Sequence, residues 1–244
     1  MQYLDLTLPT PAENLVLDEA LLDEAEASET PAETLRLWEP RRPMVVVGRS
    51  SQFQAEVRLD ACRALGIAVL RRCSGGAAIV AGPGCLMYAL VLNYRLRPQL
   101  RSLGEAHRWV LGTLAGALSD FAPGVECKGT SDLAIGRRKF SGNSARLRRN
   151  HLLYHGTLLY DFPLELVERC LAMPPRMPDY REDRGHESFL TNLPLPPETI
   201  RKALVDAFAA DEFRVSWPEH RTAQLVVEKY GLPEWQMQDW RQSE

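Results

Sequence analysis

Apolar and polar positions along this chain recur with two different periods. Between residues 11 and 27, Leu15, Leu17, Leu21 and Leu22 recur at helical spacing among acidic residues, which predicts an amphipathic helix. Short apolar runs bounded by Gly, Pro or Arg predict strands. These runs are TLRLWE (34–39), MVVVG (44–48), IAVLRR (67–72) and CLMYALVLNY (85–94). The first two are expected to flank a turn at PRRP, and the third is expected to be buried.

The second half of the chain mixes both periods. We predict helices at 59–65, 101–121, 198–210 and near 218–230, another helix and then a Pro-rich loop (174–197) after residue 163, and a short strand before the last helix. The pattern of residues 131–162 predicts an antiparallel meander of strands, with turns at Gly-Arg and near Arg-Arg-Asn. Without regular βαβ alternation, the pattern favours an α+β fold with a mixed, mostly antiparallel sheet flanked by helices. One domain is expected to span residues 1–244.

Composition excludes several classes of protein. Hydrophobic residues make up 45% of the chain and charged residues 25%, and the formal charge of −3 gives no general attraction to nucleic acid or an anionic membrane. No basic-then-apolar leader and no run of about 20 apolar residues is found. Five cysteines lie apart without a CxxC pair, which favours free thiols in a reducing cytoplasm over a zinc site or disulfides. We therefore expect a cytoplasmic protein without nucleic-acid or membrane partners.

The segment RRCSGGAAIV (71–80) places two arginines beside a turn of small residues. The glycines leave main-chain N–H groups accessible, so the turn could bind an anion with Arg72 adding charge. The segment matches neither GxGxxG nor GxxxxGK[ST]. Taken alone, it is better interpreted as a hairpin turn with solvated arginines.

SDLAIGRRKFSGNSA (131–145) places Asp132 and Lys139 on either side of a two-residue turn. A carboxylate and an ammonium brought together by a hairpin could bind a metal–nucleotide, with Asp132 for Mg²⁺ and Lys139 for phosphate oxygens. A cross-strand ion pair worth less than about 1 kcal/mol is the alternative.

Three further features are weaker. His155 in YHGTLLYDF lies on a predicted strand, where a lone histidine is more often packed than catalytic. The 174–197 loop is long enough to be a lid or a binding loop. Six cations fall between 137 and 149, and they form either a solvated face or a docking site for an acidic partner or nucleic acid. They are Arg137, Arg138, Lys139, Arg146, Arg148 and Arg149.

Taken in order, these segments resemble one family: the lipoate–protein ligases and their octanoyltransferase relatives, within the biotin/lipoate protein ligase superfamily. RRCSGGAAIVAGPGC, SDLAIGRRKFSGNSA and YHGTLLYDF are similar to its RRxSGGGAVxHDxGN, NDL…GxKxSGSAQ and HHGTLLLDxD patterns. NLVLDEALL and LWEPRRPMVVVGRSSQFQAEV are similar to its earlier motifs. The resemblance covers residues 12–162 and implies the biotin/lipoate protein ligase catalytic-domain fold.

The resemblance also implies a reaction, in which lipoate is activated by Mg²⁺ and ATP and passed to a lysine of an acidic lipoyl-accepting domain. Lys139 matches the active-site lysine that stabilises charge while the mixed anhydride forms and breaks, and Asp132 matches the carboxylate associated with Mg²⁺. An acidic acceptor would give the cations at 137–149 a partner. The substrate- and adenylate-binding positions implied are Arg72, Ser74, Gly75, Gly76, Ala77, Ser141, Gly142, His155, Gly156 and Thr157.

The chain departs from the pattern at several positions. Ala81-Gly82 stands where the family has His-Asp, and Ala77, Ser131 and Tyr154 replace a Gly, an Asn and a His. We do not expect this chain to carry the accessory domain that many stand-alone ligases of the family have. A separate accessory protein, a ligase that acts alone, and a reaction without ATP therefore all remain open.

The reaction without ATP would be that of an octanoyltransferase, which takes octanoyl from acyl carrier protein. Cys127 is the candidate nucleophile, with its thiol pKa lowered by Lys128 and Lys139, and Cys73 and Cys85 are lesser candidates. The third alternative is a non-catalytic lipoyl-binding homologue. The sequence does not distinguish lipoyl, octanoyl and biotinyl substrates.

Overall fold

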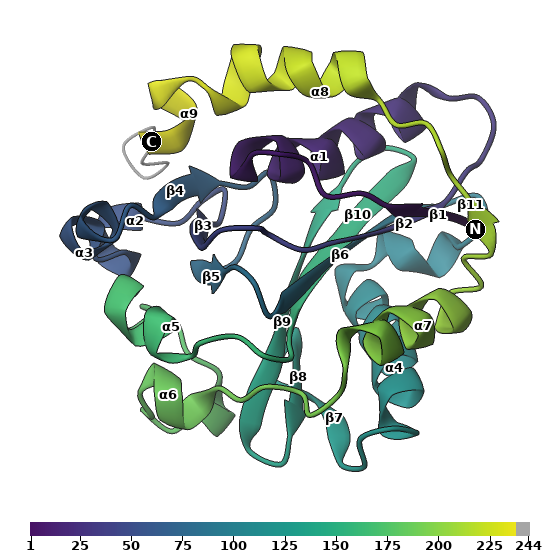
Figure 1. Ribbon diagram of the computed structural model, residues 1–244. Coiled ribbons are helices and arrows are strands. Elements are labelled where there is room, and N and C mark those ends of the chain that lie inside the picture. Colours follow the sequence, from purple (N-terminus) through teal and green to yellow (C-terminus); the bar gives the residue numbers. More distant parts are fainter. Residues whose placement is uncertain (238–244) are drawn as a thin grey trace.

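The computed structural model describes residues 1–237, and residues 238–244, where the expected domain ends, lie outside the described part (Figure 1). Within it, a mixed sheet of eight strands forms the centre of the molecule, and all its pairs are antiparallel except those that β1 makes with β2 and β11. In spatial order, its strands are β11 (Glu212–Phe213), β1 (Gln2–Asp5), β2 (Thr34–Trp38), β6 (Cys85–Asn93), β10 (His151–Leu159), β9 (Arg138–Leu147), β8 (Asp132–Ile135) and β7 (Val125–Lys128).

A second sheet of three strands lies beside the first, in the order β4 (Ala68–Arg71), β3 (Met44–Val47) and β5 (Ile79–Ala81). Helices surround both sheets (Figure 1). They are α1 (Pro11–Ala27), α2 (Phe53–Glu56), α3 (Leu59–Ala64), α4 (Leu103–Ser119), α5 (Glu165–Cys170), α6 (His186–Phe189), α7 (Pro197–Ala207), α8 (Glu219–Leu225) and α9 (Pro233–Met237), with 3₁₀ turns η1 (Pro98–Arg101) and η2 (Asp179–Arg181) and a π-helical turn η3 (Val226–Tyr230).

The central strands are buried on both faces, and alternate residues serve different cores. On β6, the side chains of Leu86, Tyr88, Leu90 and Leu92 belong to the core beneath α4 and α7. The side chains between them, those of Cys85, Met87, Ala89 and Val91, face α1 and the small sheet. The same alternation on β10 puts Leu152, Tyr154 and Leu158 in the α4 core. His151, Leu153, His155, Thr157 and Leu159 therefore point toward α1 and the small sheet, because side chains alternate along a strand. His155 and Thr157, the two predicted site residues of YHGT that have side chains, thus lie on the face of the sheet opposite α4.

The predicted α+β fold with a mostly antiparallel sheet is confirmed, as is the first helix, which begins behind a Thr10–Glu13 capping box. One expectation was wrong in detail, and another needs an addition. The strands β2 and β3 flank the PRRP segment as expected, and they belong to different sheets. The 67–72 strand is not buried throughout: β4 is an edge strand on which Ala68 is exposed and only Arg71 is buried.

Candidate active site

The hairpin of β8 and β9 brings Lys139 and Asp132 together. Lys139 Nζ lies 2.6 Å from Asp132 Oδ1, and the Asp132 side chain is almost completely buried. The two residues are not directly opposite, because Lys139 pairs with Ala134 and Asp132 with Gly142 across a β-bulge. A bulge redirects a side chain, so it lets the lysine reach the carboxylate diagonally. The ion pair that the sequence left as an alternative therefore exists, and it lies in the wall of a cavity.

The Lys139 side chain occupies space that is free because residue 142 is a glycine. A Cβ atom at residue 142 would lie 2.9 Å from Lys139 Nζ and 3.0 Å from Lys139 Cε. Any other residue here would displace the lysine chain. On the other side, the Tyr180 hydroxyl donates to Asp132 Oδ2 at 2.8 Å, and burial, with the nearby Asp132 carboxylate, raises the pKa of Tyr180 above its usual value. Asp132 is thus held by one residue of the hairpin and one residue of the 174–197 loop.

The two arginines of the Gly-rich turn are buried, which corrects the interpretation of solvated arginines. Arg71 Nη1 donates to the carbonyl oxygens of Gly48, Arg49 and Ser51. Arg72 donates to the carbonyls of Val46, Gly75 and Ala77, and burial lowers the pKa of Arg72 to about 10. Arg72 therefore braces the turn in this structure, although it also lines the cavity that contains His155.

A buried polar chain connects this turn to α1. Ser74 Oγ lies 2.5 Å from His155 Nε2, and His155 Nδ1 lies 3.2 Å from Asp18 Oδ2. Asp18 Oδ1 is held in turn at 2.6 Å by Arg36 Nη1, and both Asp18 and Arg36 are essentially inaccessible. With Nδ1–H donating to the carboxylate, Nε2 accepts the Ser74 hydroxyl hydrogen. His155 is therefore a positioning residue for the Gly-rich turn.

Gly156 has a similar role one residue further along β10. A Cβ atom there would lie 1.9 Å from Asn143 Oδ1, so glycine makes room for the Asn143 side chain. Asn143 Nδ2 donates to the Ser131 carbonyl at 2.8 Å and to Ser141 Oγ at 3.0 Å. The β9 strand is thereby bound to the start of β8, close to Asp132.

Two cavities meet at Lys139. The His155 cavity, of about 360 Å³, contains polar groups such as Asp132, Ser144 and His155 and apolar ones such as Val46 and Met87. The Phe189 cavity, of about 140 Å³, is mainly apolar. They share one wall, which we call the junction. It consists of Ala77, Ala78, Ile79, Lys139, Gly142, Thr157, Arg176 and Pro178.

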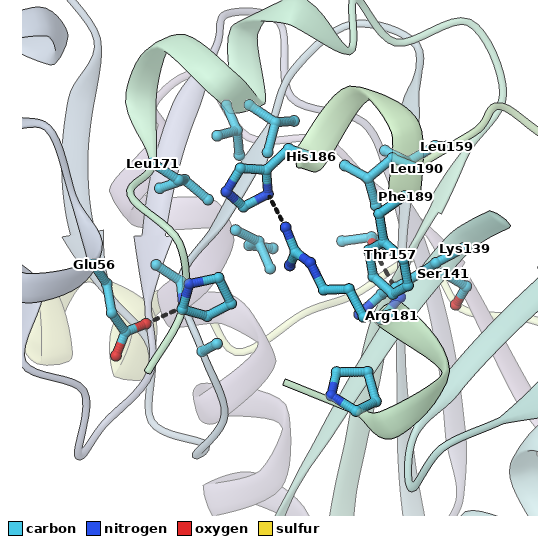
Figure 2. Close-up of a pocket in the computed structure, with 18 of the residues that line it drawn as sticks. Glu56, Lys139, Ser141, Thr157, Leu159, Leu171, Arg181, His186, Phe189 and Leu190 are labelled. Carbon is cyan, nitrogen blue, oxygen red and sulfur yellow. Dashed lines mark hydrogen bonds between the residues drawn. The ribbon is translucent and has the colours of Figure 1, made fainter. Parts of the chain in front are cut away.

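Figure 2 shows the Phe189 cavity between β9 and the segment that carries α6. Leu159, Leu171, Phe189 and Leu190 supply apolar surface, while Glu56, Arg181 and His186 are polar. Glu56 accepts from the Ala78 N–H at 2.6 Å, and His186 contacts Arg181. Burial lowers the pKa of His186, so this ring is held neutral. An apolar cavity with a few fixed polar groups is the usual form of a small-molecule site.

The structure thus places most of the predicted site residues around the two cavities. Arg72, Gly76, Asp132, His155 and Gly156 line the His155 cavity, and Ser141 lines the Phe189 cavity. Ala77, Lys139, Gly142 and Thr157 lie at the junction. Ser74 and Gly75 line neither cavity. They hold the turn in place, because Ser74 is hydrogen-bonded to His155 and the Gly75 carbonyl accepts from Arg72 and Ser144.

Cys127, the candidate nucleophile, is exposed on β7 and lies away from the two cavities. It pairs with Leu133, whose side chain is in the α4 core, and it lines neither cavity. Burial and then Glu126 raise the pKa of the Cys127 thiol, so the expected lowering by Lys128 and Lys139 was wrong. Cys73 and Cys85 are buried, and burial raises the pKa of each to about 12.

The six cations between 137 and 149 do not form one surface. Arg137 pairs with Glu182 and Arg138 donates to the Leu190 carbonyl at one end of β9. At the other end, Arg148 pairs with Asp23 of α1 at 3.1 Å. Lys139 lies in the site. The continuous docking face that the sequence suggested is therefore divided and partly neutralised.

The donor set near Lys139 suits Mg²⁺ bound through a nucleotide. Within residues 1–237, no cluster of three or more His, Cys, Asp or Glu side chains could hold a metal by itself. Mg²⁺ commonly takes one or two carboxylates together with substrate phosphates. Asp132, which faces a cavity, provides one such carboxylate.

Several site residues were missed at the sequence level. Asp18 lies between Leu15 and Leu22 on the buried side of α1, and a carboxylate in that position was the available signal. Arg36 sits in the middle of a buried strand in the same way. Tyr180 and Arg176 come from the 174–197 loop, whose length was noted but whose contacts are not local in sequence.

The mixed sheet, the Gly-rich turn and the Lys–Asp hairpin together make up a site of the kind found in protein ligases that form acyl-lysine bonds, as the family match shows. The fold matches that of a bi-partite lipoate protein ligase solved from Thermoplasma acidophilum, with a TM-score of 0.81 and 21% identity over 99% of this chain and 98% of that one. The family model of the lipoyl protein ligase A/B catalytic domain matches residues 10–211. The chain belongs to this family.

The relatives include a protein named as an octanoyltransferase and proteins named as lipoate–protein ligases. Octanoyltransferase LipM of Symbiobacterium thermophilum is 29% identical, over 92% of this chain and 93% of its own length. A putative lipoate-protein ligase A of Aeropyrum pernix is 31% identical, over 72% of this chain and 62% of its own length. The chain therefore spans nearly all of the transferase and less than two thirds of that ligase.

Proposed function

We propose that this chain is an ATP-dependent lipoate–protein ligase. The observation that carries the proposal is the position of Lys139, whose ammonium is held by Asp132 at the wall shared by two cavities. A ligase must bring a carboxylate and a nucleotide together at one point, and a fixed cation there stabilises the charge that develops. The family model and the relatives named as ligases support the same reaction.

The two cavities differ in the substrate they suit. The His155 cavity is the larger, it contains the strand that the resemblance assigns to the acyl pocket, and Leu15, Val46 and Met87 supply apolar surface for an acyl chain. The Phe189 cavity offers an aromatic ring and aliphatic walls to a purine base. In this arrangement, the lipoate carboxylate and the α-phosphate meet at the junction, under the Gly-rich turn.

The reaction follows in two steps. A carboxylate oxygen of lipoate attacks the α-phosphorus of ATP and pyrophosphate leaves. The amine of an acceptor lysine then attacks the acyl carbon and AMP leaves. Lys139 contributes a positive charge to both anionic centres, and the Ser74–His155–Asp18 chain keeps the turn in place. Asp132 would hold Mg²⁺, which neutralises phosphate charge when bound.

The proposal also covers the acceptor protein, an accessory protein and the cellular location. The Thermoplasma protein is described as a bi-partite lipoate protein ligase with its own E2 lipoyl domain, and this chain covers 98% of its length. By analogy, we propose a lipoyl domain as the acceptor and a separate accessory protein as a second component, and the acidic character of the acceptor is proposed from the family resemblance alone. Within residues 1–237, no helix is long and apolar enough to cross a membrane. Separately, we propose that the protein is cytoplasmic and that it consists of one catalytic domain.

The test is the intact mass of an apo lipoyl domain after incubation with the protein, lipoate, ATP and Mg²⁺. A gain of one lipoyl group that requires ATP supports the ligase. A domain that stays unmodified, both alone and with an accessory subunit of the Thermoplasma type, contradicts it.

An octanoyltransferase is the second candidate, and one observation favours it: the chain spans 93% of the LipM relative. The positions of the thiols give a cysteine route no support, because Cys127 lines neither cavity and Cys62, Cys73, Cys85 and Cys170 are buried. Incubation with octanoyl-acyl carrier protein and no ATP distinguishes the two. An octanoyl-sized gain would support the transferase.

A further inference from the structure

The junction between the two cavities contains one cation whose role the family motifs leave unassigned. Arg176 lies in the segment 171–190 and lines both the His155 and the Phe189 cavity. Its side chain is exposed, and within residues 1–237 no hydrogen bond or ion pair holds its guanidinium. The other cations nearby are already engaged: Lys139 with Asp132, and Arg72 with carbonyl oxygens of the turn.

Both ends of the segment are fixed by main-chain contacts. At the start, Leu171 bridges to Val57 and the Ala172 N–H donates to the Glu56 carbonyl at 3.0 Å. At the end, Leu190 bridges to Lys139, and the Thr191 N–H donates to the Lys139 carbonyl at 2.9 Å. The chain between them must therefore cross over the cavities.

Side chains fix the middle of the segment in the same place. Tyr180 reaches Asp132, and Pro178 packs at Gly129, where an added Cβ would lie 3.2 Å from the Pro178 Cβ. The other two arginines brace the segment internally. Arg181 Nε donates to the Arg184 carbonyl at 2.9 Å, and Arg184 Nη2 donates to the Tyr180 carbonyl at 2.7 Å.

We propose that Arg176 binds the anionic junction of the two substrates, contacting the α-phosphate of the nucleotide and the acyl carboxylate when both cavities are filled. This inference rests on the proposed ligase function. A planar guanidinium can form two parallel hydrogen bonds to a phosphate or a carboxylate, which an ammonium cannot. Arg176 brings this fork from the segment that faces β9, so the anions lie between it and Lys139. It thereby supplies charge that the engaged Arg72 does not.

The experiment separates adenylation from acyl transfer. Wild type, Arg176→Ala, Arg176→Lys and the control Arg169→Ala are compared by ATP–pyrophosphate exchange with lipoate and by transfer from preformed lipoyl-adenylate. Arg169 is exposed on α5 in the same part of the chain and lines neither cavity. Binding of Mg²⁺-ATP without lipoate, measured by calorimetry, gives a readout that needs no turnover.

Arg176→Ala is expected to lower kcat/KM for exchange by roughly 10- to 100-fold and to weaken ATP binding, because a charge-assisted hydrogen bond is lost. Arg176→Lys should recover part of the loss, and Arg169→Ala should match wild type. Equal behaviour of Arg176→Ala and Arg169→Ala in both assays overturns the role of Arg176 alone. A wild type that catalyses no exchange, with or without an accessory subunit, overturns the proposed function and the role of Arg176 with it.

Discussion

His155 Nε2 lies 2.5 Å from the hydroxyl oxygen of Ser74, so strand β10 is hydrogen-bonded to the turn that separates β4 from β5. The other ring nitrogen faces Asp18 on α1, and Asp18 is paired with Arg36 on β2. Four elements far apart in sequence therefore meet in one buried polar chain. The Gly-rich turn owes its position to this chain as much as to its own residues.

Replacing Asp18 tests the strength of this chain. Asp18→Asn leaves the Arg36 guanidinium buried beside a neutral amide, and breaking a buried pair in this way costs about 3–5 kcal/mol. We expect the free energy of unfolding to fall by this amount, and the midpoint of urea unfolding to fall with it. Asp60→Asn is the control, because Asp60 and its partner Arg63 are both exposed, and it should leave the midpoint unchanged. Equal midpoints for both variants would show that the Asp18 pair is not important for stability.

Gly142 offers a test of the lysine position that spares the fold. In Gly142→Ala, the new methyl group would lie 2.9 Å from Lys139 Nζ, so the flexible lysine chain must leave Asp132 while the strand remains. We expect ligase activity to fall at least tenfold with little loss of stability.

Gly112→Ala is the matched control for this variant. A Cβ at Gly112 of α4 meets nothing within 4 Å, and alanine in a helix is about 0.5–1 kcal/mol more favourable than glycine. That variant should keep full activity and unfold at a slightly higher temperature. An active Gly142→Ala enzyme would mean that the Lys139–Asp132 contact is not needed.

Cys127 gives a prediction about pH. Alkylation by iodoacetamide requires the thiolate, and burial with Glu126 raises the pKa of this thiol above its ordinary value of 9.0. The thiolate fraction therefore still increases above pH 9, and the alkylation rate should do the same. A rate that reaches its plateau below pH 8 would indicate an activated cysteine. Cys127→Ser is expected to retain wild-type transfer to the lipoyl domain.

Much of the fold follows from local patterns in the sequence. The first helix spans Pro11–Ala27, the range in which the leucine spacing predicts it, and the β8–β10 meander follows from its turns. Lys139 and Asp132 were paired correctly, because a hairpin brings residues together within a few positions.

The remaining features depend on contacts across long stretches of chain. Arg71 and Arg72 are adjacent to a turn, which suggests exposure, but carbonyl oxygens from residues 46–51 surround them. The polar chain from Ser74 to Arg36 joins four separate elements, so no local pattern reveals it. Arg176 is placed by the two ends of its segment, at Val57 and Lys139. Short-range periodicity carries no information on such contacts.

The most direct test of the account is the mass of an apo lipoyl domain after incubation with lipoate, ATP and Mg²⁺, with wild type and Lys139→Ala compared in parallel. Lys139→Arg is included, because it keeps the charge but changes its geometry. We predict a gain of one lipoyl group with wild type and, over the same time, no gain with Lys139→Ala. Equal modification by wild type and Lys139→Ala would contradict the central claim that Lys139 at the junction of the two cavities carries the reaction.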